Sequence, residues 1–230
     1  MEETLNSIGD DNGSSPEHAG HFPLLINLAE RDVVIVGGGD IAFHKAALLS
    51  PYAGSVTVYS DTFSDDFENL NVGKIKAHGN DILKAIGNPF LVICATDDHE
   101  FNDVVMKYCA EKGILCNNVD VTSSDVYFGS MIKGGPLTIS ISTNGMSPTM
   151  ARFTKETIMN ALNRSFWEML DLQTALRSRL RHSIPEMSRR REMLCSIVYD
   201  PEIWILLDQG RKAEAAEIAV RKVNSFDKQE

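Results

Sequence analysis

The chain has 230 residues, of which 43% are hydrophobic and 23% are charged, and its formal net charge is −10. This composition is typical of a globular protein, and the acidic balance argues against nucleic acid or an anionic membrane surface as the main partner. The four cysteines show no C-x-x-C spacing, no apolar run approaches a membrane span, and no secretory leader is recognisable, so we expect a cytoplasmic protein with reduced thiols.

The first predicted elements lead into a domain. Residues 1–20 are polar and acidic and predict a flexible tail. The apolar run 22–28 predicts a short edge strand. Residues 33–36 are all β-branched and predict a buried strand, which a helix over 41–49 follows.

Three glycines join that strand to that helix. Gly37, Gly39 and Ala42 form the pattern G-x-G-x-x-A. In this pattern the first glycine permits a tight turn, the second lets a pyrophosphate approach the backbone, and the alanine lets the helix pack closely on the strand. The N–H groups and the positive end of the helix would then face the anion. The context favours dinucleotide binding, and the alternative is a structural strand–helix turn that binds no ligand.

Strand-like and helix-like segments alternate through the next part of the chain. We predict strands at 55–60, 74–77, 90–95 and 114–117, and helices at 81–86 and 99–111. The second helix is expected to bury Phe101, Val104, Val105 and Tyr108. This alternation predicts an α/β fold, a Rossmann-like doubly wound parallel sheet over residues 21–125, with ligands at the carboxyl ends of its strands.

The pattern changes after Asp120. Two strand-like runs, 126–133 and 136–142, are joined by Gly134-Gly135 and predict a β-hairpin. An antiparallel excursion after such a sheet is typical of a dimerisation or substrate-binding element, so we assign region 126–165 to that role.

The remainder of the chain is predicted to be helical. Ser147-Pro148 is a helix start, with Ser as N-cap and Pro at the first helical position. Helix then continues to Val223, with breaks near 183–185 and 200–201, and residues 166–230 form a C-terminal helical domain. Charge follows the same division, because residues 1–150 hold 8 basic and 20 acidic residues whereas residues 151–230 hold 14 and 12.

The choice of nucleotide depends on the end of the second strand. An acidic residue that binds the adenosine ribose is expected roughly 20 residues beyond the glycines. Asp61 lies there, directly after the strand at 55–60. No Arg or Lys lies within residues 55–70 to meet a 2′-phosphate, so NAD is favoured over NADP.

Four segments together resemble one family. They read VVIVGGGDIAFHKAALL at 33–49, LVICATDD at 91–98, CNNVD at 116–120 and PLTISISTNGMSPTMAR at 136–152. In order and spacing they are similar to the siroheme synthase N-terminal-type precorrin-2 dehydrogenase and sirohydrochlorin ferrochelatase family. The resemblance covers roughly residues 22–165. It implies oxidation of precorrin-2 by NAD⁺ to sirohydrochlorin in sirohaem biosynthesis, by a homodimer; some members also act as a ferrochelatase, a lyase.

The resemblance also implies roles for individual residues. Asp120 closes the N-x-V-D run and would be the catalytic residue. The cofactor would be bound by Gly37, Gly38, Gly39, Asp40, Ile41, Asp61, Thr62 and Thr96. The tetrapyrrole substrate would be bound by Thr143, Asn144, Gly145, Ser147 and Arg152. No resident metal is implied.

The sequence departs from the family pattern on the substrate side. Val121 stands where a second Asp often follows the catalytic one, and Gly129 stands where Pro is common. Lys133-Gly134 replaces an Asp-Arg pair before the hairpin turn. These changes leave the NAD half unaltered and bear on the substrate loops and on ferrochelatase activity.

Several of these residues also have structural interpretations. Asp120 could be a loop carboxylate that caps a neighbouring turn, and Asp97 or Asp98 is expected to N-cap the helix that follows. His44, His78 and His99 are isolated in the sequence and are expected at the surface or at helix ends. Most of the basic residues in the last third are expected on solvated helix faces, with Arg152 the best placed to meet a substrate carboxylate.

Two further functions remain open at this stage. A non-catalytic NAD-sensing module would use the C-terminal helices to pass a signal to a partner, but it would not require a hydroxyl-rich loop such as 142–147. A dehydrogenase for another carboxylated substrate is the third possibility. Only the precorrin-2 dehydrogenase should reduce NAD⁺ when it is given precorrin-2.

Overall fold

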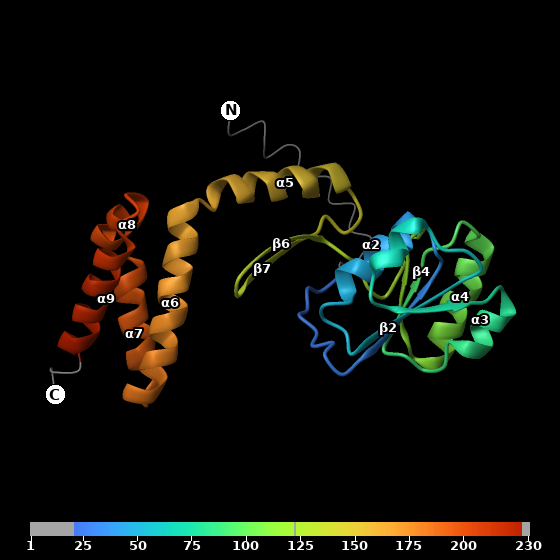
Figure 1. Ribbon diagram of the computed structural model, residues 1–230, viewed down its shortest axis with the longest axis horizontal. Coiled ribbons are helices and arrows are strands. Elements are labelled where there is room, and N and C mark those ends of the chain that lie inside the picture. The colour runs from blue at the N-terminus through green and yellow to red at the C-terminus, as the bar shows by residue number, and fades with distance from the viewer. Residues whose placement is uncertain (1–20, 122, 227–230) are drawn as a thin grey trace, which may run out of the picture. The chain divides into compact units, whose positions relative to one another are not determined.

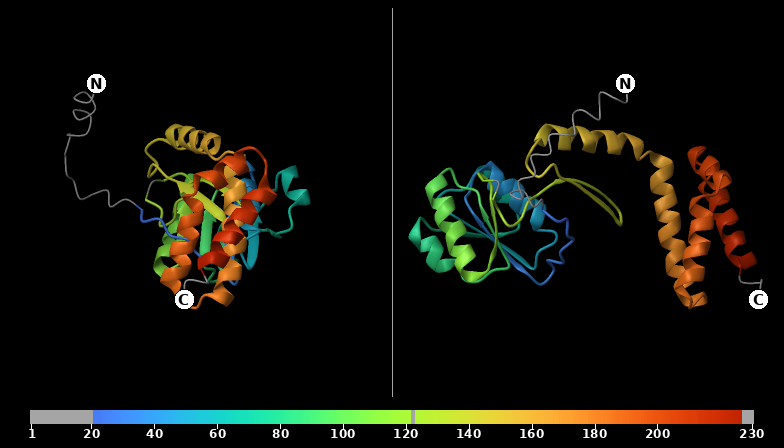
Figure 2. Two further views of the ribbon diagram at one scale, coloured as in Figure 1. Left: turned by 90° about the vertical axis from the view of Figure 1, so that its left-hand side faces the viewer. Right: turned by 180° about the vertical axis from the view of Figure 1, so that it is seen from behind.

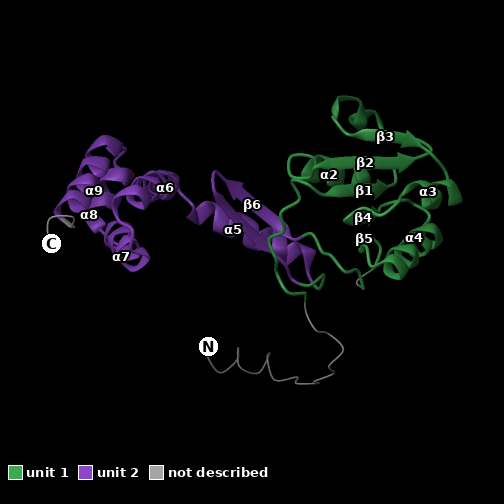
Figure 3. Cartoon of the chain, turned by 90° about the horizontal axis from the view of Figure 1, so that it is seen from below, with its two compact units in different colours: residues 1–128, 144–146 green, residues 129–143, 147–230 purple. Residues whose placement is uncertain are grey.

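The computed structural model describes residues 21–121 and 123–226 (Figure 1). The predicted tail, residues 1–20, lies outside the described part. The chain divides into two compact units, which Figure 3 colours separately. Unit 1 comprises residues 1–128 and 144–146, and unit 2 comprises residues 129–143 and 147–230.

Unit 1 is built on a five-stranded parallel sheet. In chain order the strands are β1 (Asp32–Val36), β2 (Ser55–Ser60), β3 (Gly73–Lys76), β4 (Leu91–Cys94) and β5 (Leu115–Asn118). Their order across the sheet is β3-β2-β1-β4-β5, and the strand labels in Figure 3 appear in this order. The prediction of a doubly wound parallel sheet is therefore confirmed, and β1 and β4 lie side by side as expected for two apolar runs.

Alternate side chains of β1 enter two separate cores. Val33 and Ile35 pack on one face with α2 (Asp40–Leu49) and with Phe67 of the 3₁₀ helix η1 (Asp65–Asn69). Val34 and Val36 pack on the other face with α3 (Asn80–Ala85) and α4 (His99–Lys112). Because helices cover both faces, the strand must be apolar at every position, which explains the unbroken β-branched run.

Two expectations within unit 1 are wrong. Residues 21–28 form no strand, and Phe22, Leu24 and Leu25 are exposed. Proline is tolerated in an edge strand, so Pro23 is not the reason; within the described residues no strand pairs with this run, and an apolar run alone does not make a strand. In α4, Val104 is 43% exposed, and Asn102 takes the buried position instead, beside Val105.

Unit 2 begins with the predicted hairpin. Strand β6 (Ser130–Gly134) pairs antiparallel with β7 (Leu137–Ile141). Helix α5 (Pro148–Ala161) follows, and the Ser147 side chain accepts a hydrogen bond from the Met150 N–H at its start. The predicted N-cap and N1 proline are therefore confirmed.

Four helices form a separate core in unit 2. They are α6 (Arg164–Ser183), α7 (Met187–Val198), α8 (Pro201–Asp208) and α9 (Lys212–Phe226), and they lie side by side in Figure 2. Leu180, Ile197 and Ile203 are fully buried between them. The hairpin contacts this part through Gly134, since a β-carbon there would lie 2.4 Å from the Trp167 ring.

The helix breaks are more numerous than predicted. The two expected breaks lie between α6 and α7 and between α7 and α8. Two others separate α5 from α6 and α8 from α9. Asn163 caps α6 by accepting from the Phe166 N–H, and Gly210 turns with a φ of +77°. Both residues are ordinary helix-boundary signals that the apolar periodicity obscured. Within the described ranges, no helix has the length and apolar character needed to cross a membrane.

Candidate active site

The glycine turn after β1 is built into the end of the sheet. Gly37 has a φ of +126°, and a β-carbon on it would lie 2.1 Å from the carbonyl oxygen of Ala95, just beyond β4. A β-carbon on Gly38 would lie 1.9 Å from the carbonyl oxygen of Thr62, just beyond β2. Any side chain at either position would therefore displace the backbone of a neighbouring strand end, so both glycines are sterically required.

Gly39 has a different environment. It is the N-cap of α2 with an ordinary φ of −85°, it makes no side-chain cap, and a β-carbon there would meet nothing within 4 Å. The site thus combines open space with the N-terminal end of a ten-residue helix whose first N–H groups lack a side-chain acceptor from the cap. Asp40 and Ile41 follow on the exposed rim. This arrangement fits the pyrophosphate of a dinucleotide.

Asp61 and Thr62 continue the chain beyond β2 and border the same turn. Both are exposed, and one Asp61 carboxylate oxygen, Oδ1, accepts from the Thr62 N–H at 2.8 Å. The other, Oδ2, lies 3.7 Å from Nδ1 of His78. Asp61 therefore presents a carboxylate at the carboxyl edge of the sheet, where the sequence predicted a ribose-binding acid.

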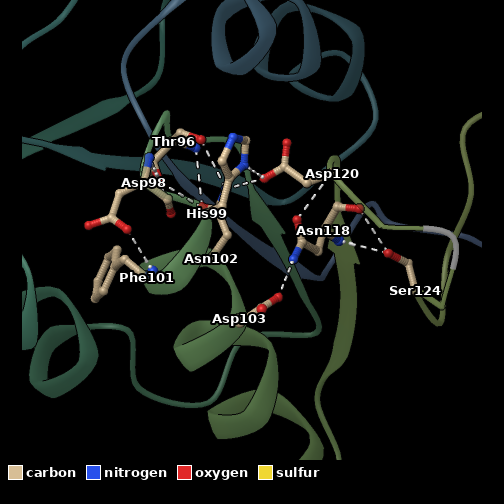
Figure 4. A network of polar contacts seen from close by, with 9 residues as sticks. All are labelled: Thr96, Asp98, His99, Phe101, Asn102, Asp103, Asn118, Asp120 and Ser124. Carbon is tan, nitrogen blue, oxygen red and sulfur yellow. Dashed lines mark hydrogen bonds and ion pairs between the residues drawn. The ribbon is translucent and has the colours of Figure 1, made fainter.

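A buried amide links the ends of β4 and β5 (Figure 4). Asn102 on α4 is fully buried, and its side-chain oxygen accepts from both the N–H and the hydroxyl of Thr96, at 3.3 and 2.7 Å. Its side-chain nitrogen donates to the Thr96 carbonyl at 2.9 Å and to Oδ2 of Asp120 at 2.7 Å. Every donor and acceptor of this amide is used, so Thr96 and Asp120 are held in one fixed arrangement.

Asp120 also contacts a histidine. Nδ1 of His99 donates to the same Oδ2 at 2.9 Å, and the side chains of His99 and Asp120 are 76% and 26% exposed. In Figure 4 the second carboxylate oxygen of Asp120 points away from these partners. The hydrogen bond from His99 lowers the pKa of Asp120, burial opposes this, and Asn102 adds to the lowering. His99 is an exposed helix-end residue as expected, and although it is isolated in the sequence, the fold brings it beside Asp120.

The backbone that carries Asp120 has its own support. The Asn118 side-chain oxygen accepts from the Asp120 N–H at 3.1 Å, and its nitrogen donates to Asp103 on α4 at 3.2 Å. The Ser124 hydroxyl bonds the N–H and the carbonyl of Asn118. Asn102, Asn118 and Ser124 were not singled out from the sequence, because the hydrogen bonds that join them around Asp120 form only in the fold. Asp98 caps α4 by accepting from the Phe101 N–H, as predicted.

The expected substrate residues follow the hairpin. In unit 2 the Thr143 hydroxyl accepts from the Ser147 N–H at 3.0 Å, and Ser147 in turn caps α5. Between them Asn144 and Gly145 have φ values of +51° and +80°, which make a tight turn. Arg152 on α5 donates to Glu156 at 3.1 Å, and its side chain is 81% exposed. The loop is therefore a hydroxyl-rich, tightly turned entry to a helix.

Comparison with known proteins supplies the context for these residues. Residues 24–130 match the family model described as putative NAD(P)-binding, and residues 135–161 match the one described as sirohaem biosynthesis protein central. The chain is 33% identical over 214 residues to the precorrin-2 dehydrogenase of Methanosarcina barkeri, which covers 89% of this chain and 94% of that one.

Longer proteins and a solved structure are also similar. The chain is 28% identical to the siroheme synthase of Blochmanniella floridana, matching over 85% of its own length but spanning only 43% of that relative. The solved structure of SirC, a precorrin-2 dehydrogenase, superposes with a TM-score of 0.71 at 23% identity, over 87% of this chain and 99% of that chain. That likeness concerns the fold.

Proposed function

Since this chain belongs to the precorrin-2 dehydrogenase family, we propose that it oxidises precorrin-2 to sirohydrochlorin with NAD⁺. The observation that supports this most directly is the carboxyl edge of the sheet. There an open glycine turn at Gly39 and a firmly held carboxylate, Asp120, occupy the ends of strands in one unit. A dehydrogenase needs a dinucleotide cradle and a base at one site.

The chemistry assigned to the chain's own residues is proton removal. The reaction takes a hydride and a proton from the reduced macrocycle, and NAD⁺ when bound supplies the hydride acceptor. Asp120 is ionised at neutral pH because its pKa lies below the usual carboxyl value. Its oxygen that points away from His99 and Asn102 can accept the proton, while the hydrogen bonds to the other oxygen hold the carboxylate still.

NAD is proposed over NADP because of Asp61. Its exposed carboxylate at the end of β2 can accept hydrogen bonds from ribose hydroxyls, and it would repel a 2′-phosphate. Gly37, Gly38 and Gly39 would accommodate the pyrophosphate, with Asp40, Ile41, Thr62 and Thr96 bordering the cofactor.

The tetrapyrrole is assigned to the 143–152 segment. Its carboxylates need donors or cations, and Arg152, Ser147 and the 143–145 turn offer both. We place the protein in the cytoplasm, a reducing compartment, because Cys94, Cys109, Cys116 and Cys195 are all free thiols in the structure.

The proposal is tested by supplying precorrin-2, generated in situ, together with NAD⁺, and following NADH formation. We expect NADH and sirohydrochlorin in equal amounts, with NADP⁺ a much poorer acceptor. Binding of NAD⁺ without NADH formation would contradict the enzyme and favour an NAD-sensing module. NADH formation with a different carboxylated substrate only would retain a dehydrogenase and remove precorrin-2.

A homodimer through region 126–165 is also proposed, and the support comes from α5. Met150 and Phe153 lie one turn apart on this helix and are 51% and 60% exposed. Neighbouring apolar side chains of this size on one face of a surface helix are typical of an interaction surface.

Replacing Phe153 with Glu should convert the dimer to a monomer, because a charge would be buried in the interface. Light scattering coupled to size-exclusion chromatography measures the mass directly. Met159→Glu is the matched control, since Met159 is 52% exposed but lies roughly 120° around the same helix. A wild-type monomer, or a Phe153→Glu variant that stays dimeric, would contradict this interface.

A further inference from the structure

His99 is placed to do more than begin a helix. It is the first residue of α4, it follows the Asp98 N-cap, and most of its side chain is open to solvent. Nevertheless its ring is directed at Asp120 rather than outward, with Nδ1 2.9 Å from Oδ2 (Figure 4). The contact therefore joins the proposed base, which is only 26% exposed, to a titratable group that water reaches freely.

The charges around the imidazole favour its protonated form. The hydrogen bond that His99 donates to Asp120 is the largest cause of a raised His99 pKa, and Asp97 and Asp98, in the loop after β4, act in the same direction. Burial opposes the rise, and so does the positive end of α4. Between the two partners, the imidazole is consequently the stronger base, and the carboxylate is the weaker one.

This asymmetry creates a requirement for the proposed reaction. A carboxylate whose pKa is lowered holds a proton poorly, so a proton taken from the substrate must leave Asp120 quickly for the step to be completed. Asn102 cannot take it, because an amide has no basic group and both of its donors and its acceptor are already engaged. Of the described residues in contact with the carboxylate, His99 is the basic one.

We propose that His99 and Asp120 act as one acid–base pair, in which His99 stores the substrate's proton and releases it to solvent. The inference rests on the proposed dehydrogenase. In the first step the substrate–hydrogen bond breaks, its electron pair stays on the macrocycle, and an O–H bond forms on Asp120. That O–H bond then breaks, solvent water carries the proton to the exposed edge of the ring, and an N–H bond forms at Nε2, because Nδ1 already carries the hydrogen that it donates to Oδ2. The pair ends as carboxylate and imidazolium, and the imidazolium loses one proton to water.

The pair predicts a particular pH dependence. It can accept the substrate's proton only while His99 is neutral, so kcat should fall as pH drops through the His99 pKa, which the hydrogen bond to Asp120 raises above the usual histidine value. In His99→Gln only protonation of Asp120 stops the reaction. The acid limb of that variant should therefore move to distinctly lower pH, although its kcat at pH 8 should be about tenfold below wild type.

Added imidazole separates proton storage from a structural role. In His99→Ala the vacated position is open to solvent, so imidazole in the buffer should restore much of the lost kcat in proportion to its concentration. In His99→Gln the longer side chain fills that space, and little restoration is expected. His182→Ala, which removes an exposed histidine at the end of α6, is the control and should keep the wild-type rate and pH profile.

The outcomes are distinguishable from failure of the proposed function. Wild-type protein that forms no NADH from precorrin-2 would refute the dehydrogenase itself, and the pair with it. An active wild type with a His99→Gln variant of unchanged kcat and pH profile would overturn the pair alone. A lower kcat with an unmoved acid limb and no response of His99→Ala to imidazole would also overturn it, because His99 would then only orient Asp120.

Discussion

Replacing Asp120 with Asn is expected to lower kcat for precorrin-2 oxidation by about 10²–10⁴-fold, the usual contribution of a positioned general base. Asn has nearly the same shape as Asp and can still accept the hydrogen bond from Asn102, so the loop after β5 should keep its conformation. Binding of NAD⁺, measured by titration calorimetry, should be close to that of wild type, because the glycine turn is unchanged.

The matched control is Asp81→Asn, which removes the same charge from unit 1. Asp81 is an exposed residue of α3 that pairs with Lys84, so this variant should keep the wild-type kcat. If Asp120→Asn keeps a rate within a few-fold of wild type, the chain can still be a dehydrogenase, but Asp120 is not its base. If it loses NAD⁺ binding as well, the residue supports the cofactor site instead.

Gly37→Ala is expected to destabilise unit 1 by about 3 kcal/mol or more. The backbone strain of a side chain at a φ of +126° costs about 1–3 kcal/mol. Overpacking costs a similar amount, because the new methyl group would lie 2.1 Å from the Ala95 carbonyl oxygen. Thermal unfolding followed by circular dichroism should show the lower midpoint, and NAD⁺ binding should be lost with the turn.

Gly39→Ala provides the contrast two residues away. Its β-carbon meets no protein atom and its backbone angles suit alanine, so stability should change by less than about 1 kcal/mol. The methyl group would occupy the space proposed for the pyrophosphate, and the Kd for NAD⁺ should rise about tenfold or more, equivalent to about 1.4 kcal/mol. Unchanged NAD⁺ affinity in this variant would contradict the proposed cradle at Gly39.

The sheet could be predicted from the sequence because its signals are local. The runs at 33–36 and 91–94 are apolar at every position, which two helix-covered faces require, and the glycines between strand and helix mark the turn. The same reasoning failed at 22–28, where a largely apolar run has no partner strand among the described residues. Apolarity indicates burial or pairing only when the fold supplies a neighbour, and that neighbour is not encoded locally.

The polar part of the site was only partly predictable. Asp120 and Thr96 were assigned through the resemblance to a known family, and the position of Asp120 after a predicted strand agreed with its assigned role. Asn102 was missed because it occupies an apolar face of α4, where the helical period predicts a hydrophobic residue. His99 was considered isolated because its partner lies 21 residues further along the chain. The contact between His99 and Asp120 forms only because β4, α4 and β5 pack together, and this packing cannot be read from the local sequence.

The positions of the two tryptophans have a consequence for fluorescence spectroscopy. The chain has two tryptophans, Trp167 and Trp204, and both belong to unit 2, where each indole N–H donates to a backbone carbonyl. Unit 1, which carries the glycine turn and Asp120, contains none. Intrinsic tryptophan emission will therefore report unfolding of the helical unit 2. It will not report unfolding of unit 1, which carries the glycine turn. Introducing a tryptophan at the exposed Tyr52 would give the sheet unit an optical signal of its own.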